Sequence, residues 1–385
     1  MNKQTIKFFY INGLKFFIIL VFILLNNSIL AQYYPNSFYR NIQIDTAKAN
    51  FLEFRIENSN FLKNDEYFND IVQGYTLIGY FINPKLVYYP TKNARIEAGI
   101  HFLKYSGIEN FTKVLPTFSF HYQAGKFVEI VIGTLNGTAN HEIIAPVFNS
   151  EYFFTDNVEN GLQFLFDTKF YKGDIWINWQ QFIFKGDKIQ EMFTTGISNR
   201  FFVNGQNKLH SFSIPLQILF EHHGGQINET SNSVITFNNS AIGINYSYNP
   251  VNSFVKKASV EFSYVSFKDQ STVHLLPYIQ GYGLYSSATV KASYFNLNVA
   301  HWFGDFYLSG RGDPIYQSAS TIYQGYYEPQ RALITSRLMF EKSIIKGLDI
   351  GAGFESYFDL YNFYIDYWYM FYINFNRDFF IKKFK

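Results

Sequence analysis

Residues 211–221 read SFSIPLQILFE, a stretch in which apolar and mostly polar side chains alternate. Phe212, Ile214, Leu216, Ile218 and Phe220 occupy every second position. Successive side chains of a β-strand point to opposite faces, whereas an amphipathic helix needs apolar residues three and four positions apart. The stretch therefore predicts a β-strand with one apolar face.

Similar alternating stretches of about ten residues recur from about residue 50 to residue 376. They predict about sixteen strands, with about 14 to 18 possible, at 50–58, 72–89, 94–106, 116–124, 127–136, 161–171, 174–184, 191–203, 207–222, 238–248, 253–267, 286–303, 306–313, 331–343, 348–358 and 364–376. An even number of membrane-crossing strands is the rule for single-chain bacterial barrels. The predicted fold class is all-β, a transmembrane antiparallel up-and-down β-barrel.

The connections between these stretches alternate between short and mostly longer ones. The short ones are rich in the Gly, Asn and Asp that tight turns need, and they include 91–93, 124–126, 172–173, 204–206, 249–252, 304–305 and 345–347. The other class comprises 59–71, 107–115, 137–160, 185–190, 223–237, 268–285, 314–330 and 359–363. In outer-membrane barrels the short turns are periplasmic and the long loops extracellular. We therefore expect both termini in the periplasm.

Composition agrees with a membrane barrel. Of the 385 residues, 21% are aromatic and only 16% are charged, against about 25% charged in an average protein. After the N-terminus, no apolar run reaches the roughly 18 residues of a spanning helix, and a closed barrel is the other structure that satisfies its backbone in lipid. A net charge of +2 without a long basic run argues against nucleic-acid binding. The absence of cysteine excludes disulfides and thiolate metal sites, and we expect no cofactor.

The N-terminus predicts a cleaved signal peptide over residues 1–31. Lys3 and Lys7 precede the apolar run 16–25, and the segment ends at Ala31. Residues 32–48 fall outside the alternating pattern and predict a short periplasmic arm, so that residues 49–385 form the barrel. No linker or charge block marks a second domain.

Alternation divides the strand residues into a lipid face and a lumen face. Phe118, Phe120, Phe262 and Tyr264 are among those assigned to lipid. The charged residues predicted to line the lumen are Glu53, Arg55, Glu57, Glu97, His101, Glu129, Asp167, Lys169, Glu221, Glu261, Lys291, Arg337, Glu341, Asp349, Glu355 and Asp366. A basic residue at mid-membrane on the lipid face costs about 2 to 4 kcal/mol, which supports this assignment. Two breaks in the alternation, near 181 and 294, predict β-bulges.

Several motifs raise the question of a specific site. His101 and His121 are assigned to the lumen, and barrel lipases use a His with a Ser and an Asn. No serine stands next to either histidine in a motif like those of that family, so a catalytic site is the less favoured interpretation. His222-His223 lacks a third metal ligand at suitable spacing. Gly310-Arg311-Gly312-Asp313 contains Arg-Gly-Asp but is predicted to close a strand.

The longest predicted loop, 137–160, carries the aromatic cluster Tyr152-Phe153-Phe154. Exposed phenylalanines are unfavourable in water, so we expect this loop to fold into the barrel. The alternative is an extracellular loop that binds surface ligands.

The signal segment, about sixteen aromatic-rich strands and sorted turns together resemble the porin-like outer-membrane barrels of diderm bacteria. The resemblance implies diffusion of small polar solutes through a mixed-charge lumen, because sixteen strands leave an aqueous channel in porins. Glu53, Arg55, Glu97, Arg337, Glu341 and Glu355 would line the constriction. The alternatives are a plugged barrel that binds or assembles through its loops and, less favoured, a lipid hydrolase or acyltransferase. The leading expectation is thus not an enzyme.

The same resemblance implies the cell outer membrane as location and its lipid bilayer as partner. It also implies the barrel-insertion machinery, a small polar solute and, for some relatives, a homo-oligomer. Family members often end on Phe, whereas this chain continues past Phe375 to Phe384 and Lys385. Phe384 is the residue left to supply that insertion signal.

Overall fold

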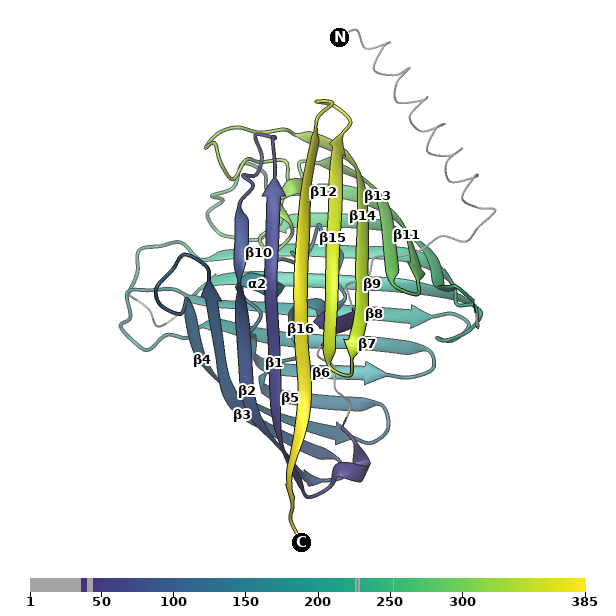
Figure 1. Ribbon diagram of the computed structural model, residues 1–385. Helices are drawn as coiled ribbons and strands as arrows, with labels where there is room; N and C mark the ends of the chain where they lie inside the picture. The colour runs from purple at the N-terminus through teal and green to yellow at the C-terminus, as the bar shows by residue number, and fades with distance from the viewer. Residues whose placement is uncertain (1–35, 40–43, 226, 228, 252) are drawn as a thin grey trace.

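A computed structural model describes residues 36–39, 44–225, 227, 229–251 and 253–385. The predicted signal peptide lies outside these residues, as do residues 32–35 and 40–43 of the predicted arm. Within them the chain forms sixteen antiparallel strands, each paired with its neighbours in sequence, and β1 pairs with β16 to close the barrel. Figure 1 shows the strands winding round the barrel wall from β1 to the adjacent β16. The predicted fold class is confirmed.

The strands vary in length from seven residues to nineteen. In chain order they are β1 Phe51–Glu66, β2 Thr76–Thr91, β3 Ala94–Tyr105, β4 Lys113–Ala124, β5 Val128–Thr134, β6 Asn160–Asp167, β7 Tyr171–Gln181, β8 Glu191–Phe202, β9 His210–Gly224, β10 Ile235–Tyr248, β11 Val255–Asp269, β12 Gln280–Ala292, β13 Phe295–Asp305, β14 Gln330–Ile345, β15 Leu348–Asp359 and β16 Ile365–Lys383.

Helical structure in the described residues is confined to short turns. They are η1 Asn36–Phe38, η2 Thr46–Lys48, η3 Thr138–His141, α2 Tyr152–Thr155 and η4 Pro314–Tyr316. None of them has the length and apolar character needed to cross a bilayer.

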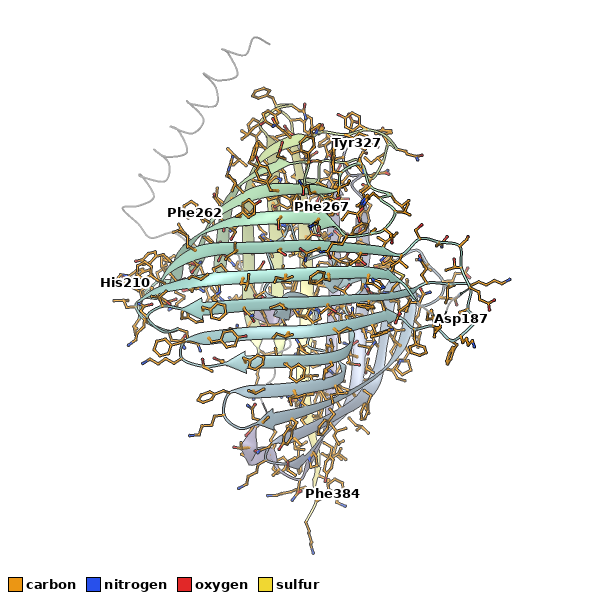
Figure 2. All side chains as sticks on the ribbon, turned by 180° about the vertical axis from the view of Figure 1, so that it is seen from behind. Asp187, His210, Phe262, Phe267, Tyr327 and Phe384 are labelled. Atoms are coloured by element: carbon orange, nitrogen blue, oxygen red, sulfur yellow. The ribbon has the colours of Figure 1, made fainter. Side chains whose placement is uncertain are left out.

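Side-chain exposure along the strands follows the predicted period of two. In β11 the residues Glu261, Ser263 and Val265 are buried, while the intervening Phe262 and Tyr264 are about half exposed. Figure 2 shows Phe262 on the outer surface of the barrel, with His210 and Asp187 at opposite ends of the strands. The apolar outer surface and the polar inner surface are those expected of strands between lipid and a lumen.

One hairpin differs from the prediction. The segment 286–303 is not a single strand with a bulge near 294, because residues 293–294 form a two-residue connection between β12 and β13. The predicted turn 304–305 is the end of β13, and the predicted strand 306–313 belongs to the long connection that follows. A tight hairpin and a bulge shift the apolar phase alike, so the pattern alone did not separate them.

Two smaller points concern the strand that precedes β8. The bulge predicted near 181 is present, as a register shift between Trp179 and Gln181. The turn predicted at 172–173 lies instead at 168–170, so Lys172 and Gly173 are strand residues of β7.

Two long connections fill the barrel rather than extending away from it. We call residues 135–159 and 306–318 the plug. Phe153 and Phe154 of the plug are only 3% and 4% exposed and pack with Phe38 and Phe61. Figure 1 shows α2 between the front and rear walls. The predicted inward folding of loop 137–160 is confirmed.

Polar contacts attach the plug to opposite parts of the wall. Lys63 of β1 forms an ion pair with Glu151 at 2.6 Å, and the backbone N–H of Ile144 donates to Gln217 of β9 at 3.2 Å. The two plug segments also bind each other, because the Tyr307 hydroxyl donates to the carbonyl oxygen of Pro146 at 2.8 Å. The plug is therefore held inside the barrel from both sides and by contacts between its own two segments.

Candidate functional site

A serine, a histidine and a glutamate meet on the inner wall at β4 and β5. Ser119 and His121 are two positions apart in β4, so both side chains point inward. Glu129 in β5 pairs across from Gln123, which makes it the diagonal neighbour of His121. Strand geometry alone therefore brings the three side chains together.

Their hydrogen bonds form a continuous chain. His121 Nε2 lies 3.2 Å from Ser119 Oγ, and His121 Nδ1 lies 2.8 Å from Glu129 Oε1. A hydroxyl beside a histidine whose other nitrogen is held by a carboxylate is the arrangement of an activated serine nucleophile. All three side chains are buried, so bulk water does not compete for these bonds.

One arginine, Arg95 of β3, lies beside this triad. Arg95 Nη2 lies 3.1 Å from His121 Nδ1, and Arg95 Nε lies 2.9 Å from Glu97 Oε1. Arginine only donates, and one nitrogen cannot accept from Arg95 while donating to Glu129. The tautomer that donates from Nδ1 to Glu129 leaves Nε2 free to accept the Ser119 proton, as general-base catalysis requires.

The plug adds an amide to the site. Asn136 is held by Gln163, whose side chain bonds both its backbone N–H, at 3.0 Å, and its carbonyl oxygen, at 3.2 Å. The Asn136 Nδ2 amino group is buried and has no hydrogen-bond partner among the described residues. It lines the same small cavity as Ser119 and His121. A buried donor without a partner is costly, and it is available to a developing oxyanion.

Two cavities adjoin the triad. The one lined by Ser119 and His121 has a volume of about 30 Å³, which is enough to hold water. Glu129 and Asn136 also line a larger cavity of about 600 Å³, beside the short turns that follow β4 and β6. We call this larger space the vestibule. The two cavities share Asn136 in their linings.

A second buried histidine fixes the plug to the wall. His141 Nε2 lies 2.9 Å from Glu159, its Nδ1 lies 2.8 Å from Asp174, and its ring stacks on Trp176 at 3.6 Å. Burial disfavours the charged ring, but the two carboxylates outweigh it and raise the pKa of His141 to about 9. His141 is therefore a cation in a structural clamp and has no free nitrogen for catalysis.

Most of the predicted lumen residues face inward, but they do not line one open pore. The buried ones are Glu53, Arg55, Glu57, Glu97, His101, Glu129, Glu261, Arg337, Glu355 and Asp366. The partly buried ones are Glu221, Lys291, Glu341 and Asp349, whereas Asp167 and Lys169 are exposed at the end of β6 and in the turn after it.

Several of these residues are engaged in ion pairs within the wall. Arg55 binds Glu97 at 3.0 Å and also binds Asp378, and Lys85 binds both Glu57 and Glu97 at 2.9 Å. Arg337 lies 3.7 Å from Glu355 on the other side of the β1–β16 seam. Of the six residues predicted at the constriction, Arg55 pairs with Glu97 and Arg337 with Glu355.

Ser119, Asn136 and Arg95 were missed by sequence reasoning. Ser119 had a readable signal, because a Ser-x-His spacing places both side chains on one face of a strand. The search for a serine in a family-like motif next to a histidine overlooked this pair, because residues two apart in a strand, and not adjacent ones, share a face. Asn136 had no signal, because its position depends on how the plug folds.

The other motifs have local roles. His101 Nδ1 lies 2.6 Å from Asn83 Oδ1, and His223 binds Glu221 at 2.9 Å while His222 binds Thr236 at 2.9 Å. No group of three or more potential metal ligands occurs within the part of the chain that the structure describes.

The Arg-Gly-Asp segment was predicted to close a strand, but it does not. It belongs to the plug, where the Arg311 guanidinium stacks on Tyr152 at 3.8 Å and Gly312 is buried.

A closed barrel with an apolar outer surface, a polar inner wall and inward-folded loops is an outer-membrane β-barrel protein of porin-like architecture, as predicted. Within that class the family is more specific. A family model described as lipid A 3'-O-deacylase-type matches residues 44–384, and the chain belongs to this family. The expectation that the protein is not an enzyme is therefore wrong, since the family is named for a deacylase activity.

Among curated proteins, none matches this chain. Solved structures with a similar chain path include a loop L8 deletion mutant of OmpT from Vibrio cholerae, with 10% identity and a TM-score of 0.49 over 85% of this chain and 99% of that one. OprD of Pseudomonas aeruginosa has 8% identity and a TM-score of 0.47 over 87% and 97%. OccAB3 of Acinetobacter baumannii has 9% identity and a TM-score of 0.45 over 85% and 99%.

Proposed function

We propose that this protein is an outer-membrane esterase that removes an acyl chain from a lipid A-type glycolipid. The observation that supports this most is the hydrogen-bonded chain from Ser119 through His121 to Glu129. The substrate class is taken from the family to which the chain belongs. The reaction would be transfer of the acyl group to Ser119, followed by hydrolysis.

In the first half of the reaction, Ser119 Oγ attacks the ester carbonyl carbon and His121 Nε2 takes its proton. Glu129 keeps Nδ1 protonated and stabilises the imidazolium that forms. The Asn136 amino group can donate to the oxyanion. When the intermediate collapses, the ester C–O bond breaks and His121 returns the proton to the sugar oxygen.

In the second half, water attacks the acyl-serine carbonyl while His121 again accepts a proton. The acyl–Oγ bond breaks, a fatty acid leaves, and Ser119 regains its hydrogen. The cavity beside Ser119 is large enough to hold this water.

The test is deacylation of purified lipid A by the purified full-length protein, with mass spectrometry of the glycolipid and of the released fatty acid. Lipid A treated with wild-type protein should lose the mass of one acyl chain, whereas lipid A treated with Ser119→Ala should keep it. Ser287→Ala is a matched control, because Ser287 is also a buried inward serine but lies in β12. Equal turnover by wild type and Ser119→Ala would rule out this mechanism.

The second candidate function is passage of small polar solutes. It is favoured by the vestibule and an adjoining cavity of about 260 Å³, which share the polar residues Glu142, Lys172 and Arg200. Planar-bilayer recordings test it: deletion of residues 137–160 should keep or raise conductance if the barrel conducts. Silence of both correctly folded proteins would count against a pore.

The membrane arrangement also belongs to the proposal. The short turns and both chain termini would face the periplasm, and the long connections would face the cell exterior. The proposal also includes a cleaved signal over residues 1–31 and a short arm over 32–48. It further includes delivery by the barrel-insertion machinery and assembly into homo-oligomers. Accessibility labelling of cysteines introduced at Lys92, between β2 and β3, and at Asp187, between β7 and β8, would test the orientation in whole cells, because strand order places the two at opposite barrel ends.

A further inference from the structure

The cavity of about 260 Å³ that adjoins the vestibule is lined by unequal numbers of positive and negative side chains. Among the described residues that line it, Lys172, Arg200 and Lys257 are cationic, while Glu142 and Glu261 are anionic. The cavity therefore has one more positive than negative side chain. Both acids are already bound to cations.

Two ion pairs account for both acids and for two of the three cations, so that Lys257 remains without a carboxylate partner in the described part of the chain. Lys172 Nζ lies 2.6 Å from Glu142, and Arg200 Nη2 lies 3.1 Å from Glu261. Glu261 also accepts from the Asn245 side chain at 3.1 Å. No carboxylate of the described residues lies within salt-bridge distance of the Lys257 ammonium.

Strand register places a further positive charge near Lys257. Lys257 of β11 pairs directly with Lys291 of β12. Like charges that face each other across two strands are destabilising. A half-buried Lys257 opposite another lysine is difficult to explain by wall stability alone.

The rest of the cavity is lined by groups that can hydrogen-bond an anion. Ser211 and Ser213 are buried on β9, and Asn245 lies between Ser213 and Glu261 on the neighbouring strand. Arg200 Nη1 reaches Ser213 Oγ at 3.3 Å, which orients the guanidinium along the cavity wall. A guanidinium, a free ammonium and hydroxyls are the groups that recognise carboxylates and phosphates.

We propose that this cavity is a binding site for a small oxyanion, a carboxylate or a phosphate, held by Lys257 together with Arg200. The site lies on β8, β9 and β11, apart from the triad on β4 and β5. It is reached from the vestibule, with which it shares Tyr39, Glu142, Lys172, Arg200 and Gln217. The inference does not depend on the esterase activity.

Calorimetric titration of the full-length protein in neutral detergent with inorganic phosphate and with acetate, at constant ionic strength, tests the site. Wild type should bind at least one of the two anions at one site, and Lys257→Gln should weaken binding at least about tenfold. Lys256→Gln is the matched control, because Lys256 is its exposed neighbour on the same strand. Binding of phosphate alone or of acetate alone identifies the ligand and supports the site.

A second measurement needs no variant and covers the case in which Lys257→Gln fails to fold. Wild-type protein is acylated with a small amine reagent, and modification is quantified by mass spectrometry. The binding anion should protect Lys257 and leave Lys256 unchanged. Absence of binding by wild type, or binding unchanged by Lys257→Gln with no protection of Lys257, would overturn the proposal.

Discussion

The barrel wall and the plug are both rich in apolar side chains, but they use them differently. In β16 the exposed Phe371 and Ile373 alternate with the buried Tyr372, so every second side chain faces lipid. In the plug, Val147, Phe148, Phe153 and Phe154 are all buried and follow no fixed period. The face on which a wall residue lies is determined by its position in a strand, whereas the location of a plug residue is determined by its tertiary contacts.

The proposed esterase draws on both regions. The wall supplies Ser119, His121 and Glu129 through strand register, and the plug supplies the free amide of Asn136. If the wall performs the chemistry and the plug assists it, variants of the two regions should differ in the size and the kind of their effect. The following predictions run from the largest expected effect to the smallest.

Ser119→Ala should lower the rate of deacylation by at least about a thousandfold, because it removes the nucleophile. The barrel should remain folded, since the change removes one hydroxyl from a wall that the other strands maintain. Initial rates of fatty-acid release measure the loss of deacylation, and heat-modifiable mobility in gel electrophoresis checks folding. A loss of less than tenfold would mean that another group attacks the ester.

Asn136→Ala should lower the turnover number by about a hundredfold, the usual cost of losing one oxyanion donor. Asn140→Ala, four residues further along the plug, should have a much smaller effect. The two variants are compared by their turnover numbers at saturating substrate. Equal losses would indicate that disturbance of the plug, and not the Asn136 amide, accounts for the result.

His141 should make attachment of the plug dependent on pH. Its pKa of about 9 exceeds the ordinary value of 6.5, so its stabilising contribution is complete below pH 6.5 and is lost as pH rises through 9. The loss amounts to up to about 3 kcal/mol. Hydrogen exchange of residues 137–160, corrected for intrinsic rates, should accelerate between pH 6.5 and 9.

His141→Gln supplies the comparison for that experiment, because glutamine does not titrate. Its exchange should be fast at pH 6.5 and nearly constant up to pH 9. A wild-type protein whose corrected exchange is flat over the same interval would contradict the assignment of a charged clamp.

Phe262→Lys should destabilise the barrel by about 2 kcal/mol, because it places an ammonium at the centre of the lipid face. Lys256→Gln, near the strand end, should have little effect. Denaturant unfolding in lipid vesicles measures both. An unchanged free energy of unfolding in Phe262→Lys would show that the outer surface of β11 is not in contact with lipid.

The contrast between wall and plug also explains how far the sequence could be interpreted. Period-two patterns predicted most strands, the two faces and the lumen position of His121 and Glu129. They also showed the phase break near 294, but not that a hairpin caused it. Both outcomes invert the apolar phase, so only the pairing of Tyr285 with Trp302 distinguishes them.

The site was only half predictable for the same reason. Strand alternation places Ser119 beside His121, so this pair could have been recognised. Asn136, Arg311 and Tyr152 acquire their positions through contacts between segments far apart in sequence, such as the 2.7 Å bond from Asn149 N–H to the Arg311 carbonyl. No local pattern encodes such contacts.

The closure of the barrel by β1 and β16 has a consequence for assembly. It pairs Phe51 with Lys383, near the two ends of the chain, so the final seam is a contact of very high sequence separation and slow to form. Phe38 stacks on Phe153 at 4.0 Å and also contacts Tyr372 of β16. The last strand to be synthesised thus meets the N-terminal segment and the plug at one point. We therefore expect closure of the wall and filling of its interior to be coupled late steps of folding.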